Sequence, residues 1–279
     1  MIFHASLRMV FIAAIGLTAS ASVRADVVTL GATKDNAILD LTGQDSSNGG
    51  GPAFFAGVDG ANARHRALIS FDLSGIPAGA TITDVQLNLT LAQVAGGTGV
   101  PATSNIGLFK LNQDWGEGTT KTAGITGVAM SGQGAGAAPG DATWNAAFYS
   151  ATTPTPWLAP GGTGGNYNST ASASLFLPNN TVNNHFIWLS TPQLVADVQG
   201  WLGNSASNFG WELINANEAA NSKSIDGFYS REWHTFTGGN TNQEPALQVT
   251  FTVPEPAGVS LAAIGVLSLL LPRPFRRRA

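Results

Sequence analysis

Carboxylates are the most numerous side chains in this sequence that could act in catalysis. Two Asp or Glu residues that face each other across a cleft can hydrolyse a glycosidic bond, one as an acid and the other as a base or nucleophile. No spacing or local motif brings together any two of the candidates, which are Asp72, Asp114, Glu117, Asp197, Glu212 and Glu232. A turn or surface position is the ordinary role of each one. We therefore predict a non-catalytic protein, with a polysaccharide-degrading enzyme as the least favoured alternative.

The residues that could hold a metal ion favour a hard cation. The sequence has no cysteine. Three histidines lie beyond the N-terminal segment, and they lack the spacing of a zinc site: His65, His185 and His234. Calcium prefers carboxylate and carbonyl oxygens. Asp35 and Asn36 lie in a turn expected over residues 31–36, and Glu244 precedes the last expected strand. These three residues are the candidate ligands of a structural calcium ion, and the loop around Asp45 could add further oxygens.

Seven tryptophans are many for a chain of 279 residues. An exposed aromatic face can pack against a sugar ring while neighbouring polar side chains bind its hydroxyls. The candidate carbohydrate-binding residues lie in polar or glycine-rich surroundings and are Trp115, Trp144, Trp157 and Trp233. The remaining tryptophans lie in apolar patterns typical of a core and are Trp188, Trp201 and Trp211. Anchoring of long loops is an alternative role for the first group.

Residues 65–91 are the clearest strand-forming part of the chain. Apolar residues alternate with polar ones at Val85, Leu87, Leu89 and Leu91, the period of a strand with one face on a core. A weaker alternation runs through Ala67, Ile69, Phe71 and Leu73, with Leu68 on the other face. Between the two runs, Pro77 and Gly79 occupy favoured positions of a type I turn. The pattern predicts an antiparallel pair of strands.

Other segments predict further strands and one helix. Residues 247–253 alternate as a last strand, and residues 106–111 form a strand expected to turn Phe109 and Leu111 inward. Thr191 is a good N-cap with Pro192 in the first helical position, and Gly203 can end the helix. Its apolar residues at helical spacing are Leu194, Val195, Val198, Trp201 and Leu202. We expect this helix to close one end of a sandwich.

Residues 116–168 are rich in Gly, Ala, Thr and Pro and almost uncharged. The segment is too long for an ordinary connection. An ordered segment that wraps the sandwich and a disordered linker are the two alternatives for it.

The charge of the expected mature region excludes several partners. Residues 26–253 contain 7 basic and 16 acidic residues, a formal charge of −9. Such a surface repels nucleic acid and is not drawn to anionic membranes or strongly anionic polysaccharides, although it can recruit cations.

The N-terminus has the pattern of a secretory signal peptide. Arg8 precedes an apolar run at residues 9–17, and small residues lead to a cleavage site after Ala25. We therefore expect residues 1–25 to be removed by signal peptidase, with a buried first helix as the alternative.

The central strands and several later segments resemble the DNRLRE domain family of extracellular β-sandwich modules, some of them grouped with carbohydrate-binding modules. The likeness rests on residues 66–74 (RALISFDLS) and 76–82 (IPAGATI), followed in order by 114–118 (DWGEG), 142–144 (ATW), Trp157 with 160–162 (PGG), 194–201 (LVADVQGW), 208–211 (NFGW), 229–232 (YSRE) and 245–249 (PALQV). Near the front, Asp35 and Asn36 keep an Asp-Asn pair without the full string of the family's name. The resemblance implies a β-sandwich over residues 26–253 and binding of extracellular polysaccharide. It also implies that part of residues 116–168 wraps the sandwich in an ordered form, with Trp144 and Trp157 as anchors.

Residues 254–279 resemble the PEP-CTERM sorting signal, which an exosortase reads. Pro254, Glu255 and Pro256 precede an apolar run at 258–271, and the tail contains Arg276, Arg277 and Arg278. An apolar segment near the lower limit of spanning length, with positive charge behind it, stops translocation. We expect a single membrane helix that holds the protein before processing, with a plain tail anchor as the alternative.

These observations together predict an all-β, jelly-roll-like antiparallel β-sandwich with one short helix, between a signal peptide and a C-terminal membrane helix. The expected function is that of an exported, non-catalytic protein of the cell envelope or extracellular matrix that binds polysaccharide. A purely structural or adhesive matrix component is the alternative. The membrane is expected to be contacted only through the C-terminal helix.

Overall fold

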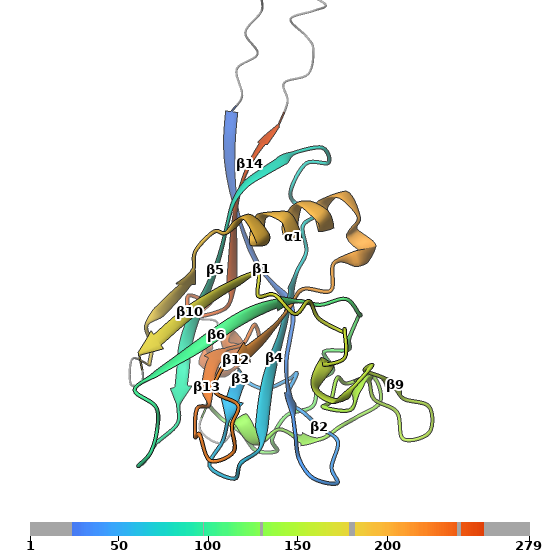
Figure 1. The fold of residues 1–279 in the computed structure, drawn as a ribbon, viewed down its shortest axis with the longest axis vertical. Helices are drawn as coiled ribbons and strands as arrows, with labels where there is room; N and C mark the ends of the chain where they lie inside the picture. Colours follow the sequence, from blue (N-terminus) through green and yellow to red (C-terminus); the bar gives the residue numbers. More distant parts are fainter. Residues whose placement is uncertain (1–23, 97, 129–130, 179–181, 239–240, 254–279) are drawn as a thin grey trace, which may run out of the picture. The chain divides into compact units, whose positions relative to one another are not determined.

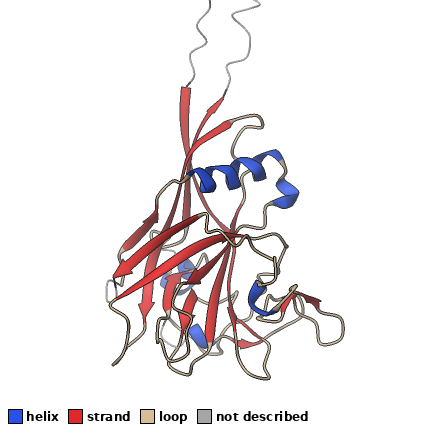
Figure 2. Ribbon diagram, viewed as in Figure 1, coloured by secondary structure: helices blue, strands red, loops and turns tan. Residues whose placement is uncertain are grey.

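The computed structural model describes residues 24–96, 98–128, 131–178, 182–238 and 241–253. Strands dominate these residues, and helices are few and short (Figures 1 and 2). The strands are β1 (Arg24–Leu39), β2 (Ser46–Ser47), β3 (Ala53–Val58), β4 (Arg64–Phe71), β5 (Thr81–Val94), β6 (Thr103–Lys110), β7 (Ala135–Gly136), β8 (Ala146–Phe148), β9 (Thr155–Pro156), β10 (Ala173–Pro178), β11 (His185–Trp188), β12 (Trp211–Asn215), β13 (Asp226–Tyr229) and β14 (Ala246–Val253). The described helices are α1 (Pro192–Gly203) and α2 (Trp233–Thr237), with short 3-10 helices at Ser131–Gln133, Pro160–Gly162 and Ser205–Ser207.

One large antiparallel sheet contains most of the strands. Its order is β10-β6-β12-β4-β3-β13-β5-β14-β1-β2-β7, with β11 added on β5, while β8 and β9 form a separate pair. Strand β1 pairs with both β14 and β4, and its residues from Ala32 to Leu39 make the ladder with β4. Because of this double pairing the sheet folds back on itself, and its apolar faces enclose a core. The expected all-β, sandwich-like character is confirmed.

The core follows the alternation of the longest strands. In β5, Val85, Leu87, Leu89 and Leu91 are buried at 1% exposure or less, as expected. The inward residues of β14 are Leu247, Val249 and Phe251, also as expected. The residues from Ala25 to Val253 form one compact unit around this core.

The expected hairpin of residues 65–91 does not form, although both of its strands do. β4 pairs with β1, β3 and β12, whereas β5 pairs with β11, β13 and β14. The connection holds two turns, closed by hydrogen bonds from Ile76 N to Leu73 O and from Ala80 N to Pro77 O. Alternation specifies which face of a strand is buried but not its partner, so this prediction was wrong in its pairing.

The expected turn at residues 31–36 is also wrong, because β1 continues through it. The register against β4 shifts between Ala32 and Lys34, and the strand then runs on to Leu39. Polar residues here are compatible with a buried strand because their side chains find partners: the Asn36 side chain, for example, donates to Ser47 Oγ and accepts from Asn48 N.

In β6 the inward face is the opposite of the one expected. Ile106 and Leu108 are fully buried in the core, whereas Phe109 packs edge-on against Tyr167, with ring centroids 5.5 Å apart. Both faces of this strand carry apolar residues, because the outer face is covered too, so alternation alone could not set its direction.

The helix α1 agrees with its prediction. Thr191 Oγ1 accepts a hydrogen bond from Leu194 N, and Pro192 is the first helical residue. Leu194, Val198 and Trp201 are buried on its inner side. The helix is fixed to the start of β5, because Gln199 accepts from Ile82 N and donates to Ala80 O.

Residues 116–168 form the covering segment, of which residues 129–130 are not described. Its Trp144 and Trp157 pack against the outer face of β1 and β4. Ile38 of β1 and Leu68 of β4 form a second apolar cluster with tryptophans of this region. The expectation of an ordered wrapping segment with Trp144 and Trp157 as anchors is confirmed.

The expected signal peptide, Pro-Glu-Pro motif, membrane helix and arginine tail lie outside the described residues, with only Arg24 and Ala25 of the first described. Among the residues that are described, no helix has the length and apolarity needed to cross a membrane.

Candidate functional site

Three of the four tryptophans predicted to contact sugar are buried instead. Trp115, Trp144 and Trp157 are exposed by only 1%, 5% and 4%. Two of the ring N–H groups donate to backbone carbonyls within the protein: Trp115 Nε1 to Phe209 O and Trp157 Nε1 to Thr143 O. A buried ring has no face for a sugar, so the prediction of exposed platforms was wrong for these three. They anchor the covering segment, the alternative role.

Trp233 begins α2 and is half-buried. Its ring lies 4.4 Å from the ring of Tyr229, centroid to centroid, and its Nε1 donates to Gln243 Oε1. Its role in carbohydrate binding stays a prediction.

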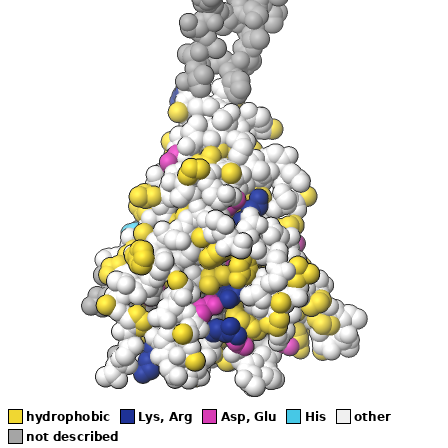
Figure 3. Space-filling model, in the orientation of Figure 1, with side chains coloured by type: hydrophobic (Ala, Val, Ile, Leu, Met, Phe, Trp, Pro, Cys, Tyr) yellow, Lys and Arg dark blue, Asp and Glu magenta, His cyan; other side chains and the backbone are white. Residues whose placement is uncertain are grey.

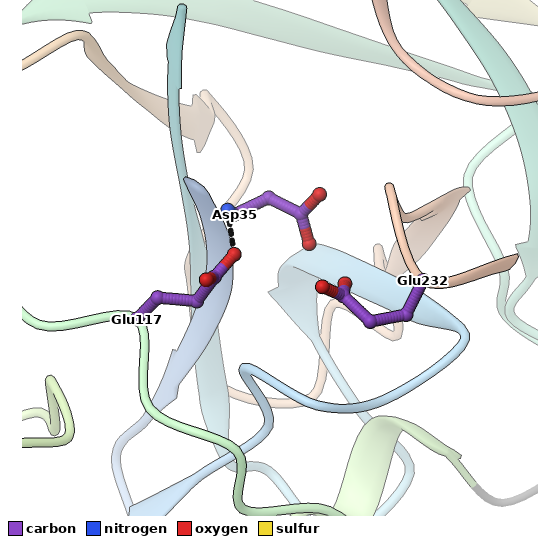
Figure 4. A group of neighbouring side chains, drawn as sticks. All are labelled: Asp35, Glu117 and Glu232. Atoms are coloured by element: carbon purple, nitrogen blue, oxygen red, sulfur yellow. Dashed lines mark hydrogen bonds between the residues drawn. The ribbon is translucent and has the colours of Figure 1, made fainter. Parts of the chain in front are cut away.

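Asp35, Glu117 and Glu232 form a carboxylate cluster. Asp35 comes from β1, Glu117 from the covering segment and Glu232 from the turn before α2. One carboxylate oxygen of each lies within 4.8 Å of the others. Figure 4 shows the three side chains converging on one space from three separate parts of the chain.

Arg231 is the cation that faces this cluster. Its guanidinium binds Glu117 through two hydrogen bonds, Nε to Oε1 at 2.6 Å and Nη2 to Oε2 at 2.8 Å, and its Nε lies 2.9 Å from Glu232 Oε1. The backbone completes the group, because Arg231 N donates to Asp35 Oδ2 and Asp35 N donates to Glu117 Oε1. Glu232 Oε2 is buried and has no partner among the described residues.

One arginine does not neutralise three carboxylates. Burial, reinforced by the charge of Glu232, raises the pKa of Asp35 well above its ordinary value. Burial also raises the pKa of Glu232 to about 7, against the attraction of Arg231. The cluster therefore needs a proton or a cation at neutral pH.

The predicted calcium ligands are only partly brought together. Asp35 belongs to the carboxylate cluster. Asn36 does not, because its side chain is committed to Ser47 and to the backbone of Asn48. Glu244 does not either, because its Oε1 accepts from His234 N and lies 2.7 Å from His234 Nδ1. Neither residue belongs to the carboxylate cluster.

Sequence reasoning missed Glu117 and Glu232 as members of this site. Both were among the candidate carboxylates, but Asp35 and Glu117 are 82 positions apart. No local spacing could have paired them.

Arg66 is the centre of a second buried group, the arginine network, with Glu212 and Glu218. Arg66 binds Glu218 through two hydrogen bonds of 2.9 and 2.7 Å and donates to Gly161 O at 2.7 Å. Glu212 Oε1 lies 3.5 Å from Arg66 Nη1. Burial raises the pKa of Glu212 to about 8 despite this arginine.

The carboxylate cluster has the oxygen donors that a hard cation requires. Calcium is bound by six to eight oxygens at about 2.3–2.6 Å, which converging carboxylates can begin to supply. The geometry of the cluster therefore suits a hard cation.

Neither the models of known protein families nor the curated proteins match this sequence. The argument for function therefore rests on the residues of this chain.

Proposed function

We propose that this chain is an exported, non-catalytic protein of the cell envelope or extracellular matrix, with a jelly-roll type of β-sandwich as a structural or adhesive module. The signal-peptide pattern at residues 1–25 and the sorting-signal pattern at residues 254–279 support export. In this proposal signal peptidase removes the first segment and an exosortase processes the second.

The burial of Trp115, Trp144 and Trp157 is the observation that carries the structural role. These side chains fix the covering segment over β1 and β4, where an open sheet could have offered a binding face. A module held rigid in this way suits a load-bearing or adhesive layer. Because three of the four candidate tryptophans are buried, only Trp233 remains for polysaccharide binding through an exposed tryptophan ring.

A divalent cation, most simply calcium, completes the proposal at the carboxylate cluster. It would tie together β1, the covering segment and the turn before α2, which meet at Asp35, Glu117 and Glu232. Extracellular calcium is abundant enough for weak sites, which in extracellular modules bind with Kd values of about 0.1–1 mM.

The surface charge supports a partner other than nucleic acid. On the face shown in Figure 3, acidic and basic side chains lie in small mixed groups rather than in one basic stripe. The formal charge of −9 over residues 26–253 points the same way.

The mass and location of the protein in its own cell test the export proposal. We expect a mature protein outside the cytoplasm that has lost residues 1–25 and the segment after the Pro-Glu-Pro motif. A cytoplasmic protein of full mass would contradict export. A membrane-bound protein that keeps residues 258–279 would contradict the exosortase step alone.

A further inference from the structure

Exposed apolar side chains are concentrated in one short part of the chain, at β10 and β11. Phe176 of β10 is 68% exposed, and Ile187 of β11 and Leu189, which follows that strand, are exposed too. With Val182 in the connection between the strands, four of the six large apolar side chains that are exposed in the described residues lie here. Single exposed apolar residues are ordinary, whereas several in one region indicate an interaction surface.

Strand β10 is an open edge of the large sheet. On one side it pairs with β6, from Ala173 opposite Leu108 to Pro178 opposite Thr103. On its other side it pairs with no strand among the described residues. Figure 1 shows β10 at the margin of the sheet, beside β6. An open edge carries a row of backbone N–H and C=O groups with which another strand can pair.

This edge lacks most of the features that keep other edges from pairing. Charged side chains and bulges usually protect an open edge. The outward residues of β10 include Ser174 and Phe176, which are uncharged, and the ladder with β6 runs without a register shift. Only Pro178, the last residue, lacks the N–H group that a new ladder would use. The inward Leu175 is itself only partly buried, so a neighbouring strand would cover it further.

The distribution of charge favours a second copy of this chain as the partner. The formal charge of −9 over residues 26–253 makes two copies repel each other, but residues 142–196 contain no Asp, Glu, Lys or Arg. On the left side of Figure 3, level with β10 in Figure 1, apolar and uncharged side chains lie together. A partner that binds through charge finds none on this strand, whereas a second copy meets no repulsion there.

We propose that two copies of this chain associate through β10, whose strands pair antiparallel around a two-fold axis. Such a contact is self-complementary, because each copy offers the same edge to the other. It continues the sheet of one copy into the other, and each Phe176 lies against the outer face of the other copy's β10. The proposal goes beyond the structural or adhesive role and does not depend on it.

Sedimentation equilibrium of the full-length chain in a density-matched detergent measures the association. We expect a monomer–dimer equilibrium with a Kd of about 10–100 µM, because the contact is small. Phe176→Glu places a charge at the contact and should weaken the dimer at least tenfold. Leu158→Glu is the matched control, because Leu158 is 72% exposed but belongs to the covering segment, and it should change the Kd less than twofold.

Two results of this measurement would overturn the proposal. One is a wild-type chain that stays monomeric at about 0.5 mM, well above the expected Kd. The other is a dimer that Phe176→Glu leaves as stable as the wild type, because another part of the chain, such as residues 254–279, would then join the copies.

Because the chain has no cysteine, a single introduced thiol can report which surfaces meet. Ser174→Cys places it on the exposed face of β10, and Ala206→Cys places it at an exposed position after α1 as the control. A short bismaleimide linker should join two copies of the Ser174 variant at least fivefold more efficiently than two copies of the Ala206 variant. Equal yields would show that β10 is not the contact and would contradict the proposal.

Discussion

The arginine network and the carboxylate cluster each contain one arginine, but they differ in how their carboxylates face each other. In the network, Arg66 binds Glu218 through two hydrogen bonds, and Glu212 lies on its other side with a pKa of about 8. A single proton on Glu212 leaves this group neutral. In the cluster, three carboxylates converge within 4.8 Å of one another around a space, with Arg231 at one side.

The comparison shows two ways in which excess buried negative charge can be neutralised. A lone carboxylate in an apolar site takes a proton, because desolvation outweighs the nearby arginine. Carboxylates that converge can instead share a cation, because its charge and their oxygens fit together. We therefore interpret the arginine network as a fixed structural element and the carboxylate cluster as a site that responds to cations.

The largest expected effect comes from removing the arginine of the network. Arg66→Ala leaves Glu212 and Glu218 without their cation in a buried site, which should lower the free energy of unfolding by about 3–5 kcal/mol. Urea unfolding followed by tryptophan fluorescence measures it. Arg64→Ala, two residues away, breaks the partly exposed ion pair with Asp40 and the contact of Arg64 with the Trp144 ring, and should cost at most about 2 kcal/mol. Equal losses would mean that the network is not a structural element.

Removing one carboxylate from the cluster should have the opposite sign. In calcium-free buffer at pH 8, Glu232→Gln relieves a buried charge and should raise the free energy of unfolding by about 2–3 kcal/mol, because folding raises the pKa of Glu232 from 4.5 to about 7. The same variant should lose the stabilisation by calcium. Glu244→Gln is the control, because Glu244 pairs with His234 outside the cluster, and it should keep the calcium response. A variant at Glu232 that is less stable and still responds to calcium would contradict the cluster as a cation site.

The pH dependence should separate the two groups. A carboxyl whose folded pKa is raised is most stabilising when protonated, so stability should fall as pH rises from about 4.5 through 7 for Glu232 and on to about 8 for Glu212. The slope per proton is at most about 1.4 kcal/mol per pH unit. Thermal unfolding between pH 5 and 9 in a chelator should therefore show a decline. Calcium should flatten its lower part, and Glu212→Gln its upper part. A stability that rises over this range would refute both assignments.

The smallest effect should come from an exposed charge pair outside the cluster. Lys34 binds Asp114, whose side chain is 53% exposed. Asp114→Asn should change the free energy of unfolding by less than about 1 kcal/mol, because exposed ion pairs contribute little. Asparagine can still accept from Trp115 N, as Asp114 does now. A larger loss in a urea titration would contradict the minor role of this pair.

Local patterns predicted the elements whose signals are local. The alternation of β5 and β14 and the cap of α1 at Thr191 depend on neighbouring residues, and they agree with the structure. Strand partners depend on the whole chain, which is why β4 and β5 were wrongly paired. The inward face of β6 was also missed, because both sides of this strand carry apolar residues. Phe109, on the outer side, packs against Tyr167 of the covering segment.

The candidate site was predicted only in part for the same reason. Asp35 was recognised, but its partners Glu117 and Glu232 come from distant loops that only the fold brings together. The glycine-rich surroundings of Trp144 suggested exposure. In fact Gly161 lies directly against its ring, where a Cβ atom would come within 2.6 Å of Trp144 Cζ2. The glycines let the covering segment close over the tryptophans instead of exposing them.

The most direct test of the cation account is a calcium titration of the full-length chain after treatment with a chelator. Calorimetry and thermal unfolding should show one calcium ion bound with a Kd at or below about 1 mM, a higher melting temperature, and loss of both effects in Glu232→Gln. Absence of binding to the wild-type chain at 10 mM calcium, with an unchanged melting temperature, would contradict it and leave the cluster as a second proton-holding group like the arginine network.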